Sequence, residues 1–187
     1  MKFLEDDILR LRAVEPSDAD TMWEIETDSS QWRDNGMSAP YSRRNLREYA
    51  ENYDADPIRA GQLRLVAELK YDTTGRNINR NNDTTGRTIG LVDLYDISPT
   101  GRTAFIGIYV MDQHRGNGYA ARALNLMEEY ARMLLNLRIV AAKVSAANTD
   151  SRSLFEKNGY TLSGRLQDWL LSGSETSSLL IYTKKLD

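Results

Sequence analysis

The sequence predicts one domain of the mixed α/β class, and its segment pattern, its length and its lack of long apolar runs lead to that prediction. Strand-like and helix-like segments follow one another in the order β, α, α, β, β, β, α, β, α, β, β. The 187 residues, 41% of them hydrophobic, are enough for a single globular domain with a substantial core. No run approaches the roughly 20 consecutive apolar residues of a membrane helix, and charged residues interrupt the N-terminus where a signal peptide is apolar. We therefore expect a soluble, cytoplasmic protein that binds no membrane.

The first half of the chain begins with a strand, two helices and two further strands. Alternating apolar residues predict the opening strand, and the EPSD segment that follows is typical of a helix start, with Ser17 as the candidate N-cap. The two later strands are separated by a polar stretch at 72–87, which predicts a hairpin with a long connection. The elements of this half are strand 8–14, helix 18–27, a loop at 28–41 that contains Trp32, a helix from after Ser42 to about residue 53, and strands 62–70 and 88–95.

The second half is dominated by a strongly strand-like run and a long amphipathic helix. Apolar residues recur in that helix at spacings of three and four, which indicates one buried face that includes Leu124, Met127 and Leu134. A later short helix ends at Gly159, and the turn at 172–173 joins the last two strands. The elements of this half are strand 102–111, helix 117–135, strand 138–145, helix 150–158, and strands 160–170 and 174–186.

Composition excludes several kinds of chemistry. The chain has no cysteine and one histidine, which excludes disulfides, thiolate metal sites and a cysteine nucleophile and leaves a Ser-His-Asp triad very hard to assemble. We therefore predict no metal site. The net charge of -3 argues against a general nucleic-acid binder.

Charge is distributed unevenly along the chain. Residues 1–60 hold 14 acids and 8 bases, a net charge of -6, whereas residues 61–187 hold 13 acids and 16 bases, a net charge of +3. This asymmetry suits an anionic cofactor on the C-terminal part and a cationic acceptor near the N-terminal part. An unevenly charged solvated surface explains it equally well.

The junction between strand 102–111 and the long helix carries the most informative motif, QHRGNGYA at residues 113–120. A glycine-bearing loop that opens a helix directs several backbone N–H groups and the positive end of the helix dipole at one point, where a phosphate can bind. Gly116 and Gly118 would let the backbone approach such a phosphate closely. Simple turn geometry is the alternative interpretation of the glycine pair.

Two linked motifs resemble the signatures of the GNAT superfamily of acetyltransferases. Gln113-x-x-Gly116-x-Gly118, between a strand and a helix, resembles the pyrophosphate loop that binds coenzyme A in this superfamily. Residues 148–160, NTDSRSLFEKNGY, resemble its second signature, an Asn followed by a short helix that ends in Glu-Lys-x-Gly-aromatic. One helix and one strand separate the two, as the superfamily requires. The resemblance covers most of the chain and is greatest to the branch of ribosomal-protein N-terminal acetyltransferases and spermidine or diamine acetyltransferases.

The resemblance implies a GNAT fold, a mixed and mostly antiparallel sheet with splayed central strands flanked by helices, in one domain over residues 1–187. It also implies acetyl-CoA as co-substrate. The backbone of Ile108, Tyr109 and Val110 would pair with the pantetheine arm, and an N–H near Val110 would stabilise oxyanion charge. Asn148 would hydrogen-bond the pantetheine. The pyrophosphate would be held chiefly by main-chain amides of Arg115, Gly116, Asn117, Gly118, Tyr119 and Ala120.

The resemblance also implies candidate catalytic groups. Relatives often carry a Tyr at the position of Phe155, where it reprotonates the leaving thiolate, and Phe155 cannot donate a proton. Ser151 is then the favoured acid; it is equally an ordinary first-turn helix residue, and the thiolate could also leave without a protein acid. Asp93 is the first candidate for the general base, with Glu24 or Glu26 second. His114 is expected to be a surface residue.

The function implied is transfer of an acetyl group from acetyl-CoA to a primary amine, by direct attack. The acceptor would be a small polyamine-like or aminoglycoside-like molecule or a protein N-terminus. One alternative is a non-catalytic module that binds acyl-CoA, and another is a structural domain that binds no ligand. Sheet edges in this superfamily often pair, so a homodimer is also expected.

Overall fold

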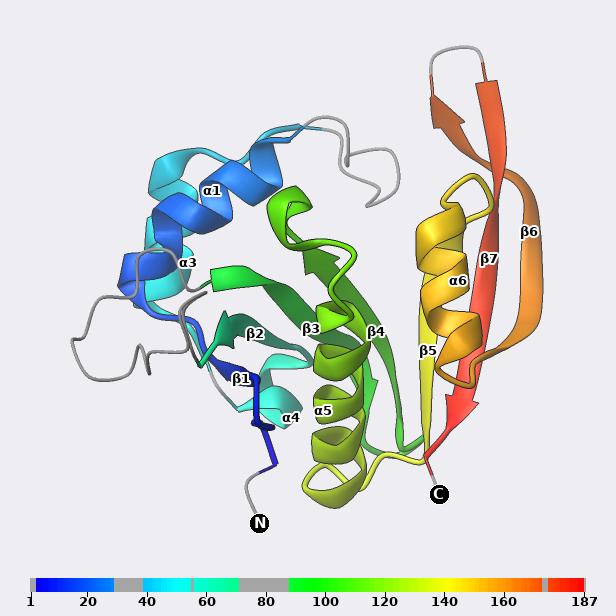
Figure 1. The fold of residues 1–187 in the computed structure, drawn as a ribbon, viewed down its shortest axis with the longest axis horizontal. Coiled ribbons are helices and arrows are strands. Elements are labelled where there is room, and N and C mark those ends of the chain that lie inside the picture. The colour runs from blue at the N-terminus through cyan, green and yellow to red at the C-terminus, as the bar shows by residue number, and fades with distance from the viewer. Residues whose placement is uncertain (1–2, 29–38, 55, 71–87, 173–174, 187) are drawn as a thin grey trace. The chain divides into compact units, whose positions relative to one another are not determined.

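The computed structural model describes residues 3–28, 39–54, 56–70, 88–172 and 175–186 (Figure 1). The chain divides into two compact units, the first formed by Met1–Val14, Ala55–Val140 and Lys185–Asp187 and the second by Glu15–Asp54 and Ala141–Lys184. The predicted order of strands and longer helices is confirmed in the described residues. Because two units are present, the single-domain interpretation stays a prediction.

The first unit contains an antiparallel meander of four strands and one long helix. Each strand of the meander pairs with the next in sequence, with Leu11 opposite Ala67, Leu65 opposite Val92 and Leu94 opposite Ile106. The elements are β1 (Leu9–Ala13), α4 (Pro57–Ala60), β2 (Leu63–Leu69), β3 (Thr88–Ser98), β4 (Thr103–Val110), the 3-10 turn η3 (Asp112–His114) and α5 (Tyr119–Met133).

The core of this unit follows from strand and helix periodicity. Alternate strand residues such as Leu11, Leu65 and Ile106 are buried, and α5 packs against β1, β3 and β4. Leu124 and Met127 are fully buried, as predicted. Leu134 is 54% exposed, so its predicted burial is wrong, because the helix ends one residue earlier, at Met133.

The face of β1 and β2 that points away from the apolar core of this unit carries charged residues. Glu68 is 1% exposed, and its carboxylate accepts hydrogen bonds from Arg10 Nη2 at 2.6 Å and Arg12 Nε at 2.5 Å. A buried carboxylate is tolerated only when such partners replace its hydration. The meander therefore has one apolar face and one face that is polar at this end.

The second unit contains two N-terminal helices and a group of three strands with one helix. Strand β7 lies between β5 and β6, and β6 and β7 form a long antiparallel hairpin (Figure 1). Helices α1 and α3 pack against each other. The elements are the 3-10 turn η1 (Pro16–Asp18), α1 (Ala19–Thr27), α3 (Arg43–Glu51), β5 (Ile139–Ser145, from Ala141 onward in this unit), α6 (Thr149–Lys157), β6 (Thr161–Ser172) and β7 (Glu175–Lys185, up to Lys184 in this unit).

The prediction that Ser17 caps the first helix is wrong. Residues Pro16–Asp18 form a 3-10 turn, so Ser17 lies inside it, and the Asp18 carboxylate accepts from the backbone N–H of Glu15 at 2.8 Å. The predicted start after Ser42 is confirmed, since the Ser42 hydroxyl accepts from Asn45 N at 3.0 Å.

Some sequence predictions cannot be followed further in the molecule. Trp32 and the whole 72–87 connection lie outside the described residues, as does Gly173 of the last turn. Within the described part of the chain, no helix combines the length and the apolar composition that crossing a bilayer requires.

Candidate functional site

The loop between β4 and α5 leaves the start of a long helix open. Gly116 and Gly118 have φ values of 79° and 77°, in the left-handed region where glycine is strongly preferred. Among the described residues, a Cβ built at either position meets no atom within 4 Å. Gly118 is the N-cap of the 15-residue α5 and supplies no side-chain cap, and the first turn contains no acidic residue. These features suit a phosphate group, which can accept from first-turn N–H groups.

Side chains of the loop brace its backbone. The Arg115 guanidinium donates to the Val110 carbonyl at 2.9 Å and pairs with Asp112 at 2.9 Å. The Asn117 side-chain amide donates to the carbonyls of His114 and Arg115 at 3.2 and 3.1 Å. The geometry therefore assigns these side chains to the shape of the loop.

His114 contributes no charge to the loop near neutral pH. Its side chain is half-buried, and burial lowers the pKa of His114 below its usual value of 6.5. The neutral imidazole thus neither attracts nor repels an anion there.

The end of β4 is joined to the loop through Val110. Ile108 and Tyr109 are half-buried and Val110 is buried, and the Val110 carbonyl accepts the hydrogen bond from Arg115. Across the strand pair, a Cβ at Gly90 would lie 1.9 Å from the Tyr109 carbonyl oxygen. Only glycine allows this close approach of β3 to β4, so Gly90 fixes the position of the predicted pantetheine-binding backbone.

Asp93 lies in the middle of β3 and is held by an arginine. Its two carboxylate oxygens accept from Arg64 Nε at 2.8 Å and Arg64 Nη2 at 2.9 Å, and the two residues are in register across β2 and β3. On the other side, Asp93 is in register with Gly107 of β4. A Cβ at Gly107 would lie 3.9 Å from Asp93 Cβ and 3.7 Å from Tyr95 Cε1, so Gly107 places no side chain against these two residues.

Tyr95 is the next residue of β3 on this face. Its ring stacks on Phe105 with centroids 5.6 Å apart. Burial, with the nearby charges of Asp96 and Asp93, raises the pKa of Tyr95 to about 12, so the phenol is protonated at neutral pH. Sequence reasoning did not single out Arg64, Gly107 or Tyr95. The alternation of TIGLVDLY places Asp93 and Tyr95 on one face and was the available signal.

The second predicted signature forms a capped helix start in the second unit. The Asn148 side-chain oxygen accepts from Ser151 N at 2.9 Å, which makes Asn148 the N-cap of α6. Ser151 is half-buried in the first turn. Phe155 is 3% exposed and packs edge-on against Tyr160 at a centroid distance of 4.9 Å, so it is a core residue. Gly159 ends the motif with a φ of 84°.

The predicted site residues therefore form three local groups. The loop and β4 residues lie together in the first unit, Asp93 lies with Arg64 in the same unit, and Asn148 and Ser151 lie together in the second. Among the described residues, no group of three or more His, Cys, Asp or Glu side chains could hold a metal ion.

Comparisons with known proteins identify the family. Residues 9–161, well over half of the chain, match the model of the acetyltransferase (GNAT) domain. The Bacillus subtilis protein YdaF, provisionally named a ribosomal N-acetyltransferase, is 25% identical over 94% of this chain and 90% of its own length. Spermidine N(1)-acetyltransferase of Escherichia coli K12 is 23% identical over 91% of this chain and 83% of its own.

A solved structure shares the fold. Spermidine N-acetyltransferase from Vibrio cholerae, in complex with CoA and spermine, superposes with a TM-score of 0.78 over 97% of both chains, at 22% identity. The predicted mixed, mostly antiparallel α/β fold and the resemblance drawn from the two signatures are confirmed. The chain belongs to the GNAT family of acetyltransferases, in which acetyl-CoA is the co-substrate that supplies the acetyl group.

Proposed function

We propose that this N-acetyltransferase acetylates a primary amine of a small, cationic, polyamine-like molecule, by direct attack of the amine on acetyl-CoA. The observation that carries the proposal is the open start of α5 after Gly116 and Gly118, where main-chain amides are available to a pyrophosphate. A protein N-terminus is the second candidate acceptor, favoured by the relative YdaF, which aligns over 94% of this chain.

Main-chain groups would hold acetyl-CoA. The amides of Gly116, Asn117, Gly118, Tyr119 and Ala120 would donate to the pyrophosphate. The Arg115 N–H, which was also predicted to do so, already donates to the Asp112 carbonyl at 3.2 Å. The backbone of Ile108, Tyr109 and Val110 would pair with the pantetheine arm, with Asn148 as a further donor through its side-chain amide. An N–H near Val110 would donate to the oxygen of the reacting carbonyl.

Asp93 would accept the proton from the acceptor amine, directly or through a water. Arg64 occupies one lone-pair site on each carboxylate oxygen, which leaves a second site on each. Gly107, which has no side chain, lies in register with Asp93 on β4. Arg64 would then act as a positioning residue that fixes the direction of the remaining lone pairs. Glu24, exposed on α1, and Glu26 are the other candidate bases.

Ser151 would return a proton to the leaving thiolate. The Ser151 backbone N–H donates to the Asn148 side chain. The Ser151 hydroxyl has no hydrogen-bond partner among the described residues. Because Phe155 is an apolar core residue, a proton donor at this helix must come from a neighbour such as Ser151.

A cationic acceptor is supported by the charge of the N-terminal segment and by the relatives. Residues 1–60 carry a net charge of -6, and Asp20 and Glu24 are exposed on α1. The Escherichia coli and Vibrio cholerae proteins are named for spermidine, which is a polycation. We also propose that the enzyme works in the cytoplasm and forms homodimers.

The test is acetyl-CoA-dependent thiol release with spermidine and with N-terminal peptides as acceptors. The chain has no cysteine, so the enzyme adds no thiol background. Turnover with spermidine above that with peptides supports the polyamine proposal, and the reverse order assigns the protein N-terminus. Binding of CoA without turnover on either acceptor would contradict both and favour the acyl-CoA-binding module.

The role of Asp93 is tested by Asp93→Asn. General-base catalysis typically contributes about 10²–10⁴-fold, so kcat should fall by at least about 100-fold with CoA affinity retained. Asp96→Asn, the same change three residues along β3, is the matched control and should keep kcat within about twofold. An Asp93→Asn enzyme with the wild-type kcat would remove Asp93 from the mechanism.

A further inference from the structure

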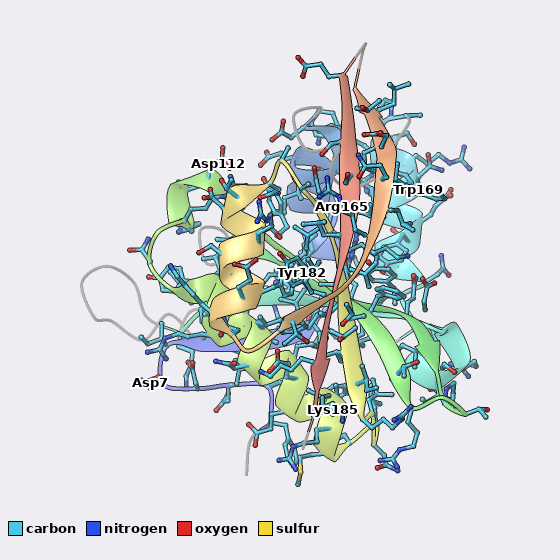
Figure 2. All side chains as sticks on the ribbon, turned by 90° about the vertical axis from the view of Figure 1, so that its right-hand side faces the viewer. Asp7, Asp112, Arg165, Trp169, Tyr182 and Lys185 are labelled. Carbon is cyan, nitrogen blue, oxygen red and sulfur yellow. The ribbon has the colours of Figure 1, made fainter. Side chains whose placement is uncertain are left out.

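One side chain of the loop between β4 and α5 reaches back to the end of β4. The Arg115 Nε donates to the Val110 carbonyl at 2.9 Å, and the Arg115 Nη2 pairs with Asp112 at 2.9 Å. The Arg115 Cζ also lies over the Tyr109 ring, 5.7 Å from its centroid. Asp112 lies in the η3 turn that follows β4 (Figure 2). Arg115 therefore contacts two consecutive residues of β4, although its own backbone belongs to the loop that opens α5.

The strand register shows which way the backbone of Val110 faces. The Met111 N–H donates to the Ile89 carbonyl of β3 at 2.8 Å. Opposed residues of an antiparallel pair alternate between hydrogen-bonded and non-hydrogen-bonded pairs. Val110, opposite Gly90, therefore directs its N–H and its carbonyl to the edge of β4 that faces away from β3. The hydrogen bond from Arg115 agrees with this direction, because β3 occupies the other edge.

The peptide that joins Val110 to Met111 is held at both of its polar groups. Its carbonyl accepts from Arg115, and its N–H donates to Ile89. A planar peptide with both groups bonded has a fixed orientation, which also restricts the direction of the Val110 N–H on the same residue. The Arg115 guanidinium covers the carbonyl oxygen on that edge. Val110 thus offers a ligand there a donor, with its acceptor already occupied.

The donors that Arg115 uses distinguish it from a phosphate-binding arginine. An arginine binds a phosphate by directing the parallel donors of its fork at two oxygens of the ligand. In Arg115 the Nε and Nη2 donors are directed at Val110 and Asp112. The carboxylate of Asp112 also compensates the positive charge. The side chain is therefore suited to holding the protein backbone.

We propose that Arg115 is a positioning residue for acetyl transfer, which holds the Val110 N–H in the direction that donates to the acetyl carbonyl of acetyl-CoA. The inference rests on the proposed function, in which an N–H near Val110 stabilises the oxyanion. Its new content is that a side chain of the loop at the start of α5 sets the geometry of this donor.

The donor acts while charge develops on the acetyl oxygen. The amine forms a C–N bond and gives its proton to a base, and one electron pair of the C=O bond moves onto oxygen. When C=O re-forms, the C–S bond breaks and its electron pair leaves with the thiolate, which a proton then neutralises. An N–H already directed at the oxygen stabilises the charged stage without reorganisation.

The first test separates the bond to Val110 from the salt bridge. Arg115→Gln removes both contacts, whereas Asp112→Asn neutralises the ion pair and leaves the bond to Val110 in place. With saturating acetyl-CoA and the better of spermidine and an N-terminal peptide, kcat should fall at least about tenfold in Arg115→Gln and stay within about twofold in Asp112→Asn. Arg132→Gln, the same change at the exposed end of α5, is the control and should keep the wild-type kcat.

Calorimetric titration with CoA completes this test. Because main-chain amides hold the pyrophosphate in the proposed function, the Kd for CoA should change by less than about threefold in Arg115→Gln. Thermal melts verify that each variant is folded. A raised Kd with an unchanged kcat at saturation would assign Arg115 to the phosphates and overturn the proposal.

The second test needs no acceptor. A hydrogen bond to the thioester oxygen moves the ¹³C signal of acetyl-CoA labelled at the acetyl carbonyl downfield from its position in free solution. Binding to the wild-type enzyme should give this shift, Arg115→Gln should reduce it by about half or more, and Asp112→Asn should keep it. Arg115→Lys keeps a charged donor on a side chain of similar length and should restore part of the shift.

The outcomes separate the inference from the proposed function. A reduced carbonyl shift in Arg115→Gln with the CoA affinity retained supports the inference. A wild-type shift and a wild-type kcat in Arg115→Gln would overturn it and leave the proposed function intact. No shift in the wild-type enzyme would overturn both the oxyanion donor and the role of Arg115. A wild-type enzyme that shifts the carbonyl signal but acetylates neither acceptor would contradict the proposed function alone.

Discussion

The two helices that follow the signature motifs begin in different ways. Helix α5 begins after Gly118, whose left-handed backbone supplies no side-chain cap, and its first turn holds no acid. Helix α6 begins after Asn148, whose side chain accepts from Ser151 N at 2.9 Å, and its first turn contains Asp150. Both helices have the same macrodipole at their N-termini.

The difference shows which features of a helix N-terminus leave its backbone N–H groups available to an anion. At α6 the chain itself satisfies a first-turn N–H and places a negative charge beside the dipole, so an added phosphate would compete with Asn148 and be repelled by Asp150. At α5 the helix's own residues supply neither a side-chain cap nor an acid in the first turn, and the carboxylates of Asp6 and Asp7 nearby are paired with Arg122. The positive end of the dipole is thus left for a ligand. The comparison therefore assigns the pyrophosphate to α5.

Blocking the open helix start should have the largest effect. Gly118→Trp directs an indole into the space before the α5 amides and should lower kcat/KM for acetyl-CoA by at least about 100-fold, or about 2.7 kcal/mol of transition-state binding. Gly61→Trp is the matched control, because Gly61 also has a left-handed φ of 70° and a Cβ built there meets no atom of the described part of the chain within 4 Å. Equal losses in the two variants would mean that backbone strain, and not the blocked site, causes the defect.

Giving α5 a charged cap should make it resemble α6. Asn and Asp both tolerate left-handed backbone, so Gly118→Asn and Gly118→Asp differ mainly by one negative charge. The Asp variant should bind CoA about tenfold more weakly than the Asn variant, because its carboxylate repels the pyrophosphate. The same charge should stabilise the free enzyme by about 0.3–1 kcal/mol. Calorimetric titration and thermal melts measure both, and equal CoA affinities would contradict the account.

Removing the N-cap of α6 should change the stability of the protein more than it changes the binding of acetyl-CoA. Asn148→Ala should lower the unfolding free energy by about 1 kcal/mol, since the Ser151 N–H loses its acceptor. Asn148→Asp keeps an acceptor and should keep the stability, while it removes the amide donor proposed for pantetheine and should raise the KM for acetyl-CoA. Urea titrations and initial rates separate the two roles. A stable Asn148→Ala enzyme would show that the cap contributes little.

The smallest expected effect concerns a salt bridge at the first turn of α5. Burial raises the pKa of Asp6, but hydrogen bonds from Leu9 N, Ile8 N and Arg122 outweigh it and hold the pKa of this carboxyl below 3.8. The pKa of Asp6 is lower in the folded protein than in the unfolded chain. The ionised Asp6 carboxylate therefore contributes its full stabilisation above pH 3.8, and this stabilisation is lost as the pH falls through the folded-state pKa. Unfolding free energies between pH 2 and 5 should thus fall less steeply in Asp6→Asn, by less than about 1 kcal/mol in all. Parallel curves for the two proteins would contradict this assignment.

Features encoded by local spacing could be predicted from the sequence. The glycine pair before α5, the Asn-to-glycine motif around α6 and the order of strands each depend on residues within a few turns of one another. Backbone preferences and periodicity act over that range, which is why Gly116, Gly118 and Gly159 were recognised from their neighbours alone. The start after Ser42 was predictable for the same reason.

Features that depend on pairing between distant strands could not be predicted. Arg64 and Asp93 meet because β2 and β3 adopt one register across a long connection, and Gly107 joins them from a third strand. No sequence pattern specifies that register uniquely. The choice of Asp18 over Ser17 at the first helix was missed for a smaller reason, since two polar residues competed within one turn and the 3-10 geometry decided between them.

The most direct test of the central claim is a ¹⁵N–¹H correlation titration with the 3′-phospho-ADP portion of coenzyme A, which lacks pantetheine. The account predicts that the amide signals of Gly116, Gly118, Tyr119 and Ala120 move most, while those of Asp150 and Ser151 at the start of α6 stay in place. Unchanged signals at the start of α5, or larger shifts at the start of α6, would contradict the assignment of the pyrophosphate to the open helix.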